Sequence, residues 1–346
     1  VCQPLLGGSA DRHPEVPLKW IVSLSLVLSL GAGAWYWLSP GMGLWETTLV
    51  WAVIGGLEVS SYPLMDAMAV QFINDGVPIR YSLGRGIGSL AYAVVCVLLG
   101  LQVGRLGLES TLLTHLLLVV AEAALVAAYP PYRGEKRTAE QTETRPQSAL
   151  SLLRSNPRFT LMLAGVLLGL TGIMPLSNFL VNIVTSRGSS QADLGLALFL
   201  MGASELPTAL FFGRLLRRLG SGRLVMLSML FGTLKGVLLL CTTSYLGVLL
   251  VQPIQVLGYG LFTPASVYFV NESVPEADRV RGQTVMMVAS NGLGGMLGGL
   301  LAGWTLDLGG ANLMLMGCIL CGCVGAVLCR LALCKKIGRL SLSKTA

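Results

Sequence analysis

Long, uninterrupted apolar runs constrain this chain more than any other feature of its sequence. Ten of them follow one another, and each approaches or exceeds the roughly 20 residues that a helix needs to cross a bilayer. The runs are continuously apolar rather than alternating, which argues against β-strands. The sequence therefore predicts an all-α polytopic membrane protein with spans at 18–38, 48–73, 84–104, 110–129, 158–185, 192–213, 222–241, 245–270, 282–306 and 312–333.

The composition supports this class. Hydrophobic residues make up 53% of the chain and charged residues 12%, and the mean hydropathy is +0.72. The 43 glycines suit closely packed membrane helices, and we interpret the four-residue spacings Gly294/Gly298 and Gly295/Gly299/Gly303 as packing surfaces. Cysteines 318, 321 and 323 fall inside an apolar span, where we expect packing and no metal site.

The distribution of Lys and Arg predicts the orientation. If the loops alternate sides, nearly all basic residues lie on one side of the membrane, and the other side holds only Arg105 and Arg187. The positive-inside rule assigns the basic side to the cytoplasm, so both termini are predicted to be cytoplasmic. This asymmetry accounts for the net charge of +7, and no nucleic-acid partner is expected.

The two halves of the chain resemble each other at a nearly constant offset. Gly8 and Gly213 each precede a basic loop and a span, an offset of 205 residues, and GIGS at 86–89 matches GLGG at 292–295, an offset of 206. Such a parallel repeat is typical of transporters built from two helical bundles. The second half has six spans and the first has four, so we expect the first helix and most of the second to be missing from this sequence.

A polar, proline-bearing stretch separates the two halves. Residues 130–157 read as a cytoplasmic linker. The predicted domains are an N-terminal bundle at 1–129, this linker, and a six-helix bundle with a short cytoplasmic tail at 158–346.

Two charges occur near the middle of neighbouring spans. Glu205 and Lys235 are equally far from the loop that joins their helices, about 20 Å at 1.5 Å per residue, so they should lie at the same depth. Ionisable residues inside a membrane usually face a partner or a watery cavity and often mark a transport path. We predict that this pair takes part in substrate or proton coupling.

The second span contains further candidates for coupling. Glu58 lies near its centre, close to Tyr62, a candidate substrate contact. Asp66 follows at the cytoplasmic end, about 80° around the helix from Glu58. Its expected partner is Arg85, in a charge pair that either locks a cytoplasmic gate or only fixes a hairpin.

The fourth span contains His115 and Glu122. Glu122 is either a coupling residue or a side chain that reaches the cytoplasmic surface. For His115 a packed or interfacial position is favoured over a proton relay.

Paired amides occur in the fifth and eighth spans. Asn178 and Asn182 share a helical face after Pro175, which should break the helix and free backbone carbonyls. Gln252 and Gln255 present amide donors and acceptors along one face. These four residues are candidate substrate contacts, although hydrogen bonds between helices explain the same pattern.

Several motifs resemble those of the major facilitator superfamily, in its proton-coupled branch of oligosaccharide, nucleoside and phenylpropionate permeases. YSLGRGIGS resembles the branch's Y-G-x-x-R-x-x-G-S pattern, with Ser82 in place of the usual Gly. Lys235 stands where the family would have Arg. The other matching segments are GGSADR at 7–12, SELP at 204–207, VNESVPEADRVRGQ at 270–283 and GLGGMLGGLLAGW at 292–304.

The resemblance implies a twelve-helix fold of two pseudo-symmetric bundles, with about ten helices present here. It implies a cytoplasmic gate that includes Asp11 and Arg12 besides Asp66 and Arg85. The expected activity is secondary transport of a sugar, nucleoside or small organic acid by proton symport with alternating access. The alternatives are an efflux antiporter of the same fold, a nutrient receptor that does not transport, and an inactive fragment.

An enzyme is not expected, because no nucleophile with a base, metal set or phosphate-binding loop occurs in the sequence. The proton gradient would supply the energy, and no cofactor is predicted. The expected partners are a small-molecule substrate and the lipid bilayer. We expect a monomer in a bacterial plasma (inner) membrane.

Overall fold

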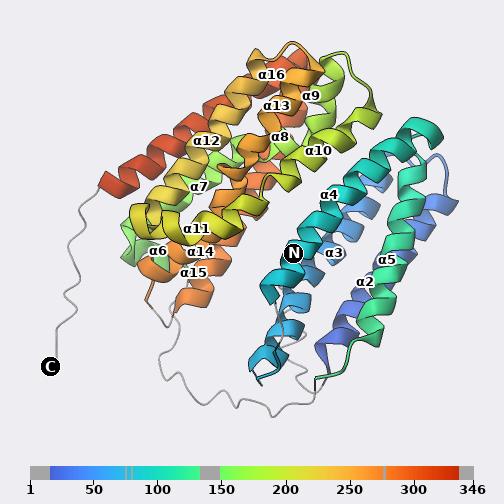
Figure 1. Ribbon diagram of the computed structural model, residues 1–346, viewed down its shortest axis with the longest axis horizontal. Helices are drawn as coiled ribbons and strands as arrows, with labels where there is room; N and C mark the ends of the chain where they lie inside the picture. The colour runs from blue at the N-terminus through green and yellow to red at the C-terminus, as the bar shows by residue number, and fades with distance from the viewer. Residues whose placement is uncertain (1–15, 75, 79–80, 133–148, 276–277, 335–346) are drawn as a thin grey trace. The chain divides into compact units, whose positions relative to one another are not determined.

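A computed structural model describes residues 16–74, 76–78, 81–132, 149–275 and 278–334. The described residues form helices joined by short turns (Figure 1). The chain divides into two compact units. The first comprises residues 1–85 and 102–139, and the second comprises residues 86–101 and 140–346. The bundle boundaries expected at 129 and 158 stay a prediction.

In the first unit, α2 (Leu18–Leu38), α3 (Leu44–Asn74) and α5 (Ser110–Ala128) pack against one another. Their shared core contains Val22 and Leu26 of α2, Leu64 of α3 and Val119 of α5. Lys19 is buried at the end of this core, and its Nζ donates hydrogen bonds to Tyr129 O at 2.9 Å and Ala127 O at 3.1 Å. The ammonium group thereby satisfies carbonyls at the C-terminus of α5.

The helix α4 (Tyr81–Leu106) contributes its middle, Gly86–Leu101, to the second unit. The remaining elements of the second unit follow in chain order. They are α6 (Ala149–Ser155), α7 (Pro157–Ile173), α8 (Pro175–Asn178), α9 (Leu180–Ser186), η1 (Gln191–Asp193), α10 (Leu194–Ala203), α11 (Leu206–Leu219), α12 (Ser221–Cys241), α13 (Tyr245–Val251), η2 (Gln252–Val256), α14 (Tyr259–Ser273), α15 (Arg279–Met287), η4 (Val288–Gly294) and α16 (Gly295–Cys334).

The helix α7 is the centre of the second unit, and glycines allow its close contacts. A Cβ atom on Gly172 would collide with the backbone carbonyl of Cys318 in α16. A Cβ on Gly298, also in α16, would lie 2.6 Å from Thr171 O. In a regular helix the N–H of residue 175 would donate a hydrogen bond to Thr171 O, but Pro175 has no N–H. Gly298 therefore covers the carbonyl that the predicted break at Pro175 leaves free.

The helix α16 contains a sharp kink at Gly309 and Gly310, where Gly310 has a φ of +70°. Gly298 and Cys318 lie on opposite sides of this kink, and both approach the same turn of α7. A straight helix would separate them by about 30 Å, so the chain must reverse between them. The two spans predicted at 282–306 and 312–333 are therefore distinct helices.

The glycine spacings predicted to be packing surfaces have different environments. Gly294 and Gly298 contact α7, and Gly295 lies near the sulfur of Met174. Nothing lies within 4 Å of the positions that Cβ atoms on Gly299 and Gly303 would occupy. The packing interpretation is therefore correct for Gly294 and Gly298, and it is wrong for Gly299 and Gly303.

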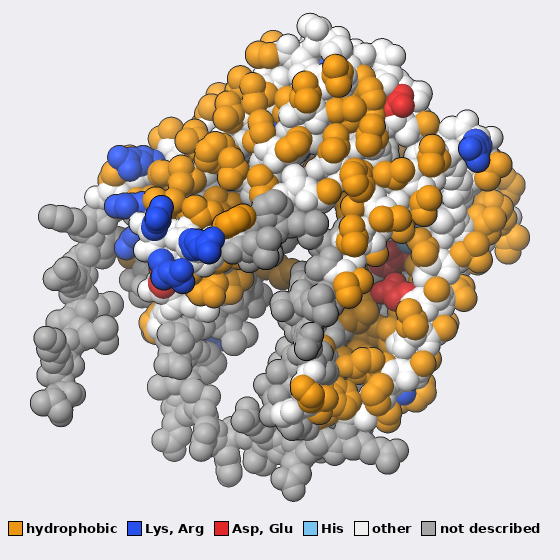
Figure 2. All heavy atoms as spheres, in the orientation of Figure 1, with side chains coloured by type: hydrophobic (Ala, Val, Ile, Leu, Met, Phe, Trp, Pro, Cys, Tyr) orange, Lys and Arg blue, Asp and Glu red, His pale blue; other side chains and the backbone are white. Residues whose placement is uncertain are grey.

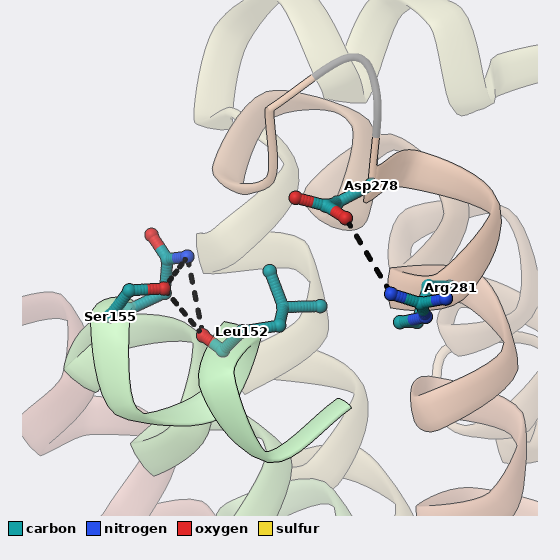
Figure 3. Close-up of polar contacts among 5 residues, drawn as sticks. Leu152, Ser155, Asp278 and Arg281 are labelled. Carbon is teal, nitrogen blue, oxygen red and sulfur yellow. Dashed lines mark hydrogen bonds and ion pairs between the residues drawn. The ribbon is translucent and has the colours of Figure 1, made fainter. Parts of the chain in front are cut away.

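The segment between α14 and α15 belongs to one of the motifs that carry the family resemblance. Asp278 is buried, precedes α15, and its Oδ1 lies 4.0 Å from Nη1 of Arg281, one turn further along (Figure 3). The neighbouring helix α6 packs against α15. Its last turn is closed by Ser155 Oγ, which donates to Leu152 O at 3.1 Å.

Seven helical stretches among the described residues are long and apolar enough to cross a membrane. The longest, at 281–334, contains the kink in α16, and two shorter apolar helices lie at 90–106 and 191–203. Hydrophobic side chains cover much of the face seen in Figure 2. Large apolar side chains such as Leu125, Leu250 and Leu320 are strongly exposed. An apolar exterior of this kind suits contact with lipid.

Candidate functional site

In the second unit, several polar side chains lie where a helix is interrupted. The predicted single span at 192–213 is two helices, because α10 ends at Ala203 and α11 starts at Leu206. Pro207, in the first turn of α11, has no N–H with which to continue the hydrogen-bond ladder of α10. Glu205 therefore lies at a break rather than in the middle of a regular helix.

A second interruption presents the two glutamines. Between α13 and α14 the chain forms the 3-10 helix η2, with Pro253 in its first turn. Residues three apart lie directly above each other in a 3-10 helix, so Gln252 and Gln255 share a face. Both side chains are buried.

Lys235, Gln255 and Glu205 form a connected polar chain. Lys235 is 1% exposed, and its Nζ donates a hydrogen bond to Gln255 Oε1 at 2.9 Å. The side chain of Gln255 also hydrogen-bonds the carboxylate of Glu205, which interacts electrostatically with Lys235. One amide group thus contacts both charged residues. The amide bridges them, and the structure gives no direct ion pair for these two residues.

Gln252 differs from Gln255 in its partners. Its Nε2 donates to Val248 O of the preceding turn at 3.2 Å, and its buried Oε1 has no hydrogen-bond partner in the described part of the chain. In the structure Gln255 contacts charged side chains, and Gln252 contacts the backbone of the preceding turn in α13. The substrate contacts expected of both glutamines stay a prediction.

Tyrosines and an asparagine surround this polar chain. Tyr259 and Tyr92 each interact electrostatically with Glu205. The hydroxyl of Tyr259 donates to Asn291 Oδ1 at 3.2 Å. Asn291 lies in η4, a π-helical segment, a distortion that often occurs at functional sites. The second unit thus brings an acid, a cation, amides and hydroxyls together where several helices are interrupted.

The first unit contains a separate polar cluster around Glu58. Ser29 of α2 donates from Oγ to Glu58 Oε1 at 2.6 Å. His115 of α5 places its Nε2 3.2 Å from the same oxygen. His115 is therefore a direct partner of Glu58, and the packed or interfacial position expected for it stays a prediction.

Glu122 and Tyr62 extend this cluster. Glu122 is seven residues after His115 on α5 and interacts electrostatically with both Glu58 and His115. Tyr62 lies one turn after Glu58 and interacts electrostatically with Glu58 and Glu122. Its side chain is 58% exposed, so it borders the cluster from outside. Glu58, His115 and Glu122 are the three side chains of this cluster that can bind a proton near neutral pH.

Asn178 and Asn182 lie on the two sides of a second break. Asn178 ends α8 and is exposed, whereas Asn182 lies in α9 and is half-buried. The interruption at Phe179 between these helices removes the regular i, i+4 relation on which the shared face was predicted. The structure gives neither amide side chain a hydrogen bond.

The residues predicted to form a cytoplasmic gate cannot be placed. Asp11 and Arg12 lie outside the described residues, and so do the side chains of Asp66 and Arg85. Among the described residues, no group of three His, Cys, Asp or Glu side chains is arranged to hold a metal ion.

Sequence reasoning missed Ser29, Tyr92, Tyr259 and Asn291. Tyr259 follows Gln255 by four residues, which was a usable signal. Ser29 and Asn291 had none, because their partners come from other helices.

Comparison with known proteins agrees with this architecture. A family model described as "MFS_1 like family" matches residues 1–315. The maltose permease of Geobacillus stearothermophilus is 25% identical over 305 residues, which is 88% of this chain and 75% of the permease.

Solved structures of the nucleoside transporter NupG have a similar fold. An Asp-to-Ala mutant of NupG superposes with a TM-score of 0.79 at 17% identity, covering 96% of this chain and 86% of that one. A second NupG structure gives a TM-score of 0.77 at 18% identity and covers 96% and 85%. Together with the family model, these similarities confirm the predicted all-helical transporter fold.

Proposed function

Because the chain belongs to the MFS_1 like family of major facilitator transporters, we propose that it carries a sugar or a nucleoside by proton symport with alternating access. The choice of solute follows from the similarity to a maltose permease and to a nucleoside transporter. Family membership also means that the chain is a secondary transporter and not an enzyme, as predicted.

The connected chain Glu205–Gln255–Lys235 is the observation that carries this proposal. A buried ammonium group is costly in an apolar interior unless opposite charge and hydrogen bonds compensate it. When Glu205 is ionised, it supplies that charge through Gln255. When a proton neutralises Glu205, the charge of Lys235 is no longer balanced. Protonation thus changes the free-energy difference between two conformations of the carrier.

Glu58 is the second candidate for a proton-binding group. Its hydrogen bond from Ser29 and its contact with His115 hold the carboxylate in place within the first unit. Glu122 and Tyr62 are near enough to respond to its charge. We assign Glu58 and His115 to proton binding and Tyr62 to the substrate path.

Asn178 and Asn182 are proposed substrate contacts because the amides of both side chains have no hydrogen bond to any of the described residues. We further propose that the protein is a monomer in a bacterial plasma membrane with both termini in the cytoplasm, and that Asp11, Arg12, Asp66 and Arg85 form the cytoplasmic gate. The asymmetry of Lys and Arg supports the orientation.

The test is transport by the purified chain in liposomes. Radiolabelled maltose and uridine are supplied separately, with and without an inward proton gradient. Glu205→Gln is expected to abolish gradient-driven accumulation while sparing exchange of labelled for unlabelled solute. Glu109→Gln, the same change at an exposed carboxylate, is expected to behave as the unmodified chain.

A different coupling residue, an antiporter and a receptor would each give a distinct result in this assay. Accumulation that survives Glu205→Gln would move the coupling role to Glu58. Gradient-driven export would indicate an antiporter. Saturable binding without flux of either solute would indicate a receptor and contradict the proposed transport.

A further inference from the structure

The second unit contains a cavity of about 530 Å³ that is separate from the polar chain around Lys235. Its lining includes Arg158 near the start of α7, Arg218 near the end of α11 and Arg223 in the first turn of α12. Its volume falls within the range of about 300–1,000 Å³ that is usual for ligand sites. Basic side chains gather over the α6 and α11 end of the second unit in Figure 2.

The cavity has an excess of positive charge. Its lining contains one carboxylate, that of Glu272, against three guanidinium groups. The carboxylate of Glu272 accepts a hydrogen bond from Ser221 Oγ. None of the three arginines has an ion pair with a carboxylate of the described residues within 4.0 Å. No described carboxylate therefore neutralises these guanidinium groups, which are the preferred donors for a phosphate or carboxylate ligand.

The start of α12 adds further donors. Gly220, with a φ of +77°, separates α11 from α12 and has no side chain with which to cap α12. The first turn of α12 has no acidic residue. The N–H groups at the beginning of a helix have no acceptors within the helix, and together with the helix dipole they favour an anion.

The walls of the cavity are partly apolar. Phe269 and Leu333 line it, and Gly222 allows α12 to approach both, because a Cβ there would lie 2.9 Å from Leu333 Cδ2. A ligand with a charged head and an apolar portion matches this lining.

The ends of candidate membrane spans place the cavity near the expected surface of a bilayer. The candidate spans 157–178 and 221–241 begin beside it, and the spans 245–273 and 281–334 end there. Residues at the ends of four spans therefore surround it. This is the level at which phospholipid phosphates meet a membrane protein, and basic pockets between helices are suited to such headgroups.

We propose that this cavity binds a phosphate group through Arg158, Arg218, Arg223 and the first turn of α12, and that the phosphate belongs to an anionic phospholipid. The site is independent of the transported solute, so its test requires no transport activity.

Native mass spectrometry of the full chain in detergent tests the site, with dioleoyl phosphatidylglycerol or dioleoyl phosphatidylcholine added. The unmodified chain is expected to bind phosphatidylglycerol at least about tenfold more tightly than the zwitterionic lipid. The triple variant Arg158→Gln, Arg218→Gln, Arg223→Gln is expected to lose this preference.

A matched control is available on α6 and α11, next to the lining arginines in the chain. The triple variant Arg154→Gln, Arg214→Gln, Arg217→Gln removes the same charge from exposed positions that do not line the cavity. It is expected to keep the lipid preference. Equal loss in both variants, or no preference in the unmodified chain, would overturn the proposal. Size-exclusion profiles and melting temperatures of both variants establish that they are folded.

Free inorganic phosphate distinguishes the source of the ligand. It is expected to displace phosphatidylglycerol only weakly at millimolar concentration, because it lacks the acyl chains that contact the apolar wall. Tight, arginine-dependent binding of inorganic phosphate without binding of phosphatidylglycerol would overturn the lipid as the source.

Discussion

At the scale of single residues, Lys235 depends on Gln255 for its only hydrogen bond to a side chain in the described structure. A buried charge that loses a partner destabilises a protein by about 3–5 kcal/mol. We therefore expect Gln255→Met to lower the melting temperature by several degrees and to abolish coupled accumulation. Thermal unfolding in detergent and liposome flux measure the two effects.

The neighbouring glutamine is a matched control for this prediction. Gln252 is also buried, and its Oε1 has no partner among the described residues. Gln252→Met removes this unsatisfied acceptor together with the hydrogen bond from Nε2 to Val248 O, and the two effects largely offset each other. Gln252→Met should therefore melt within about a degree of the unmodified chain. Lys235→Met combined with Gln255→Met should recover stability but not accumulation. A Gln255→Met variant as stable as Gln252→Met would contradict the bridging role.

At the scale of helices, the contact between α7 and α16 depends on Gly172. An added methyl group would meet the backbone carbonyl of Cys318, which cannot move without displacing α16. Overpacking of this kind costs about 1–3 kcal/mol. Gly172→Ala should therefore lower the melting temperature.

Gly299 in α16 is the control position for Gly172→Ala. Nothing lies within 4 Å of the position of its added Cβ, and alanine is favoured over glycine in a helix by about 0.5–1 kcal/mol. Gly299→Ala should leave the melting temperature unchanged or raise it. Equal melting temperatures for the two variants would mean that α7 and α16 are not packed as the structure describes.

At the scale of the whole molecule, the predicted orientation can be tested with two exposed cysteines. Cys241 ends α12, and Cys334 ends α16. The start of α12 shares a cavity with Leu333, so Cys241 lies about 30 Å from Cys334, one helix length away. The positive-inside rule places Cys334 in the cytoplasm.

Labelling of intact cells with a membrane-impermeant maleimide measures this orientation. Two variants are compared, each retaining only one of the two cysteines. The Cys241 variant should be labelled in intact cells, and the Cys334 variant only after the cells are opened. The reverse pattern would invert the orientation and place both termini outside.

Much of the fold follows from the sequence because hydrocarbon satisfies no backbone hydrogen bonds. Apolar runs of bilayer length must therefore be helices, and their positions can be predicted directly, including the two spans on either side of the kink in α16. The charges at Glu205, Lys235 and Glu58 were also readable, because an ionisable residue in an apolar run is rare and costly.

The partners of those charges were not determined by the sequence. Gln255 between Glu205 and Lys235, and Ser29 and His115 on Glu58, come from helices that only tertiary packing brings together. The breaks at Glu205 and Phe179 shift the following side chains out of the regular helical phase from which shared faces are inferred. Local composition thus determined which segments are helices and which residues carry charge. Packing between distant segments decided which polar groups meet, because a buried charge depends on whatever side chain the neighbouring helix presents.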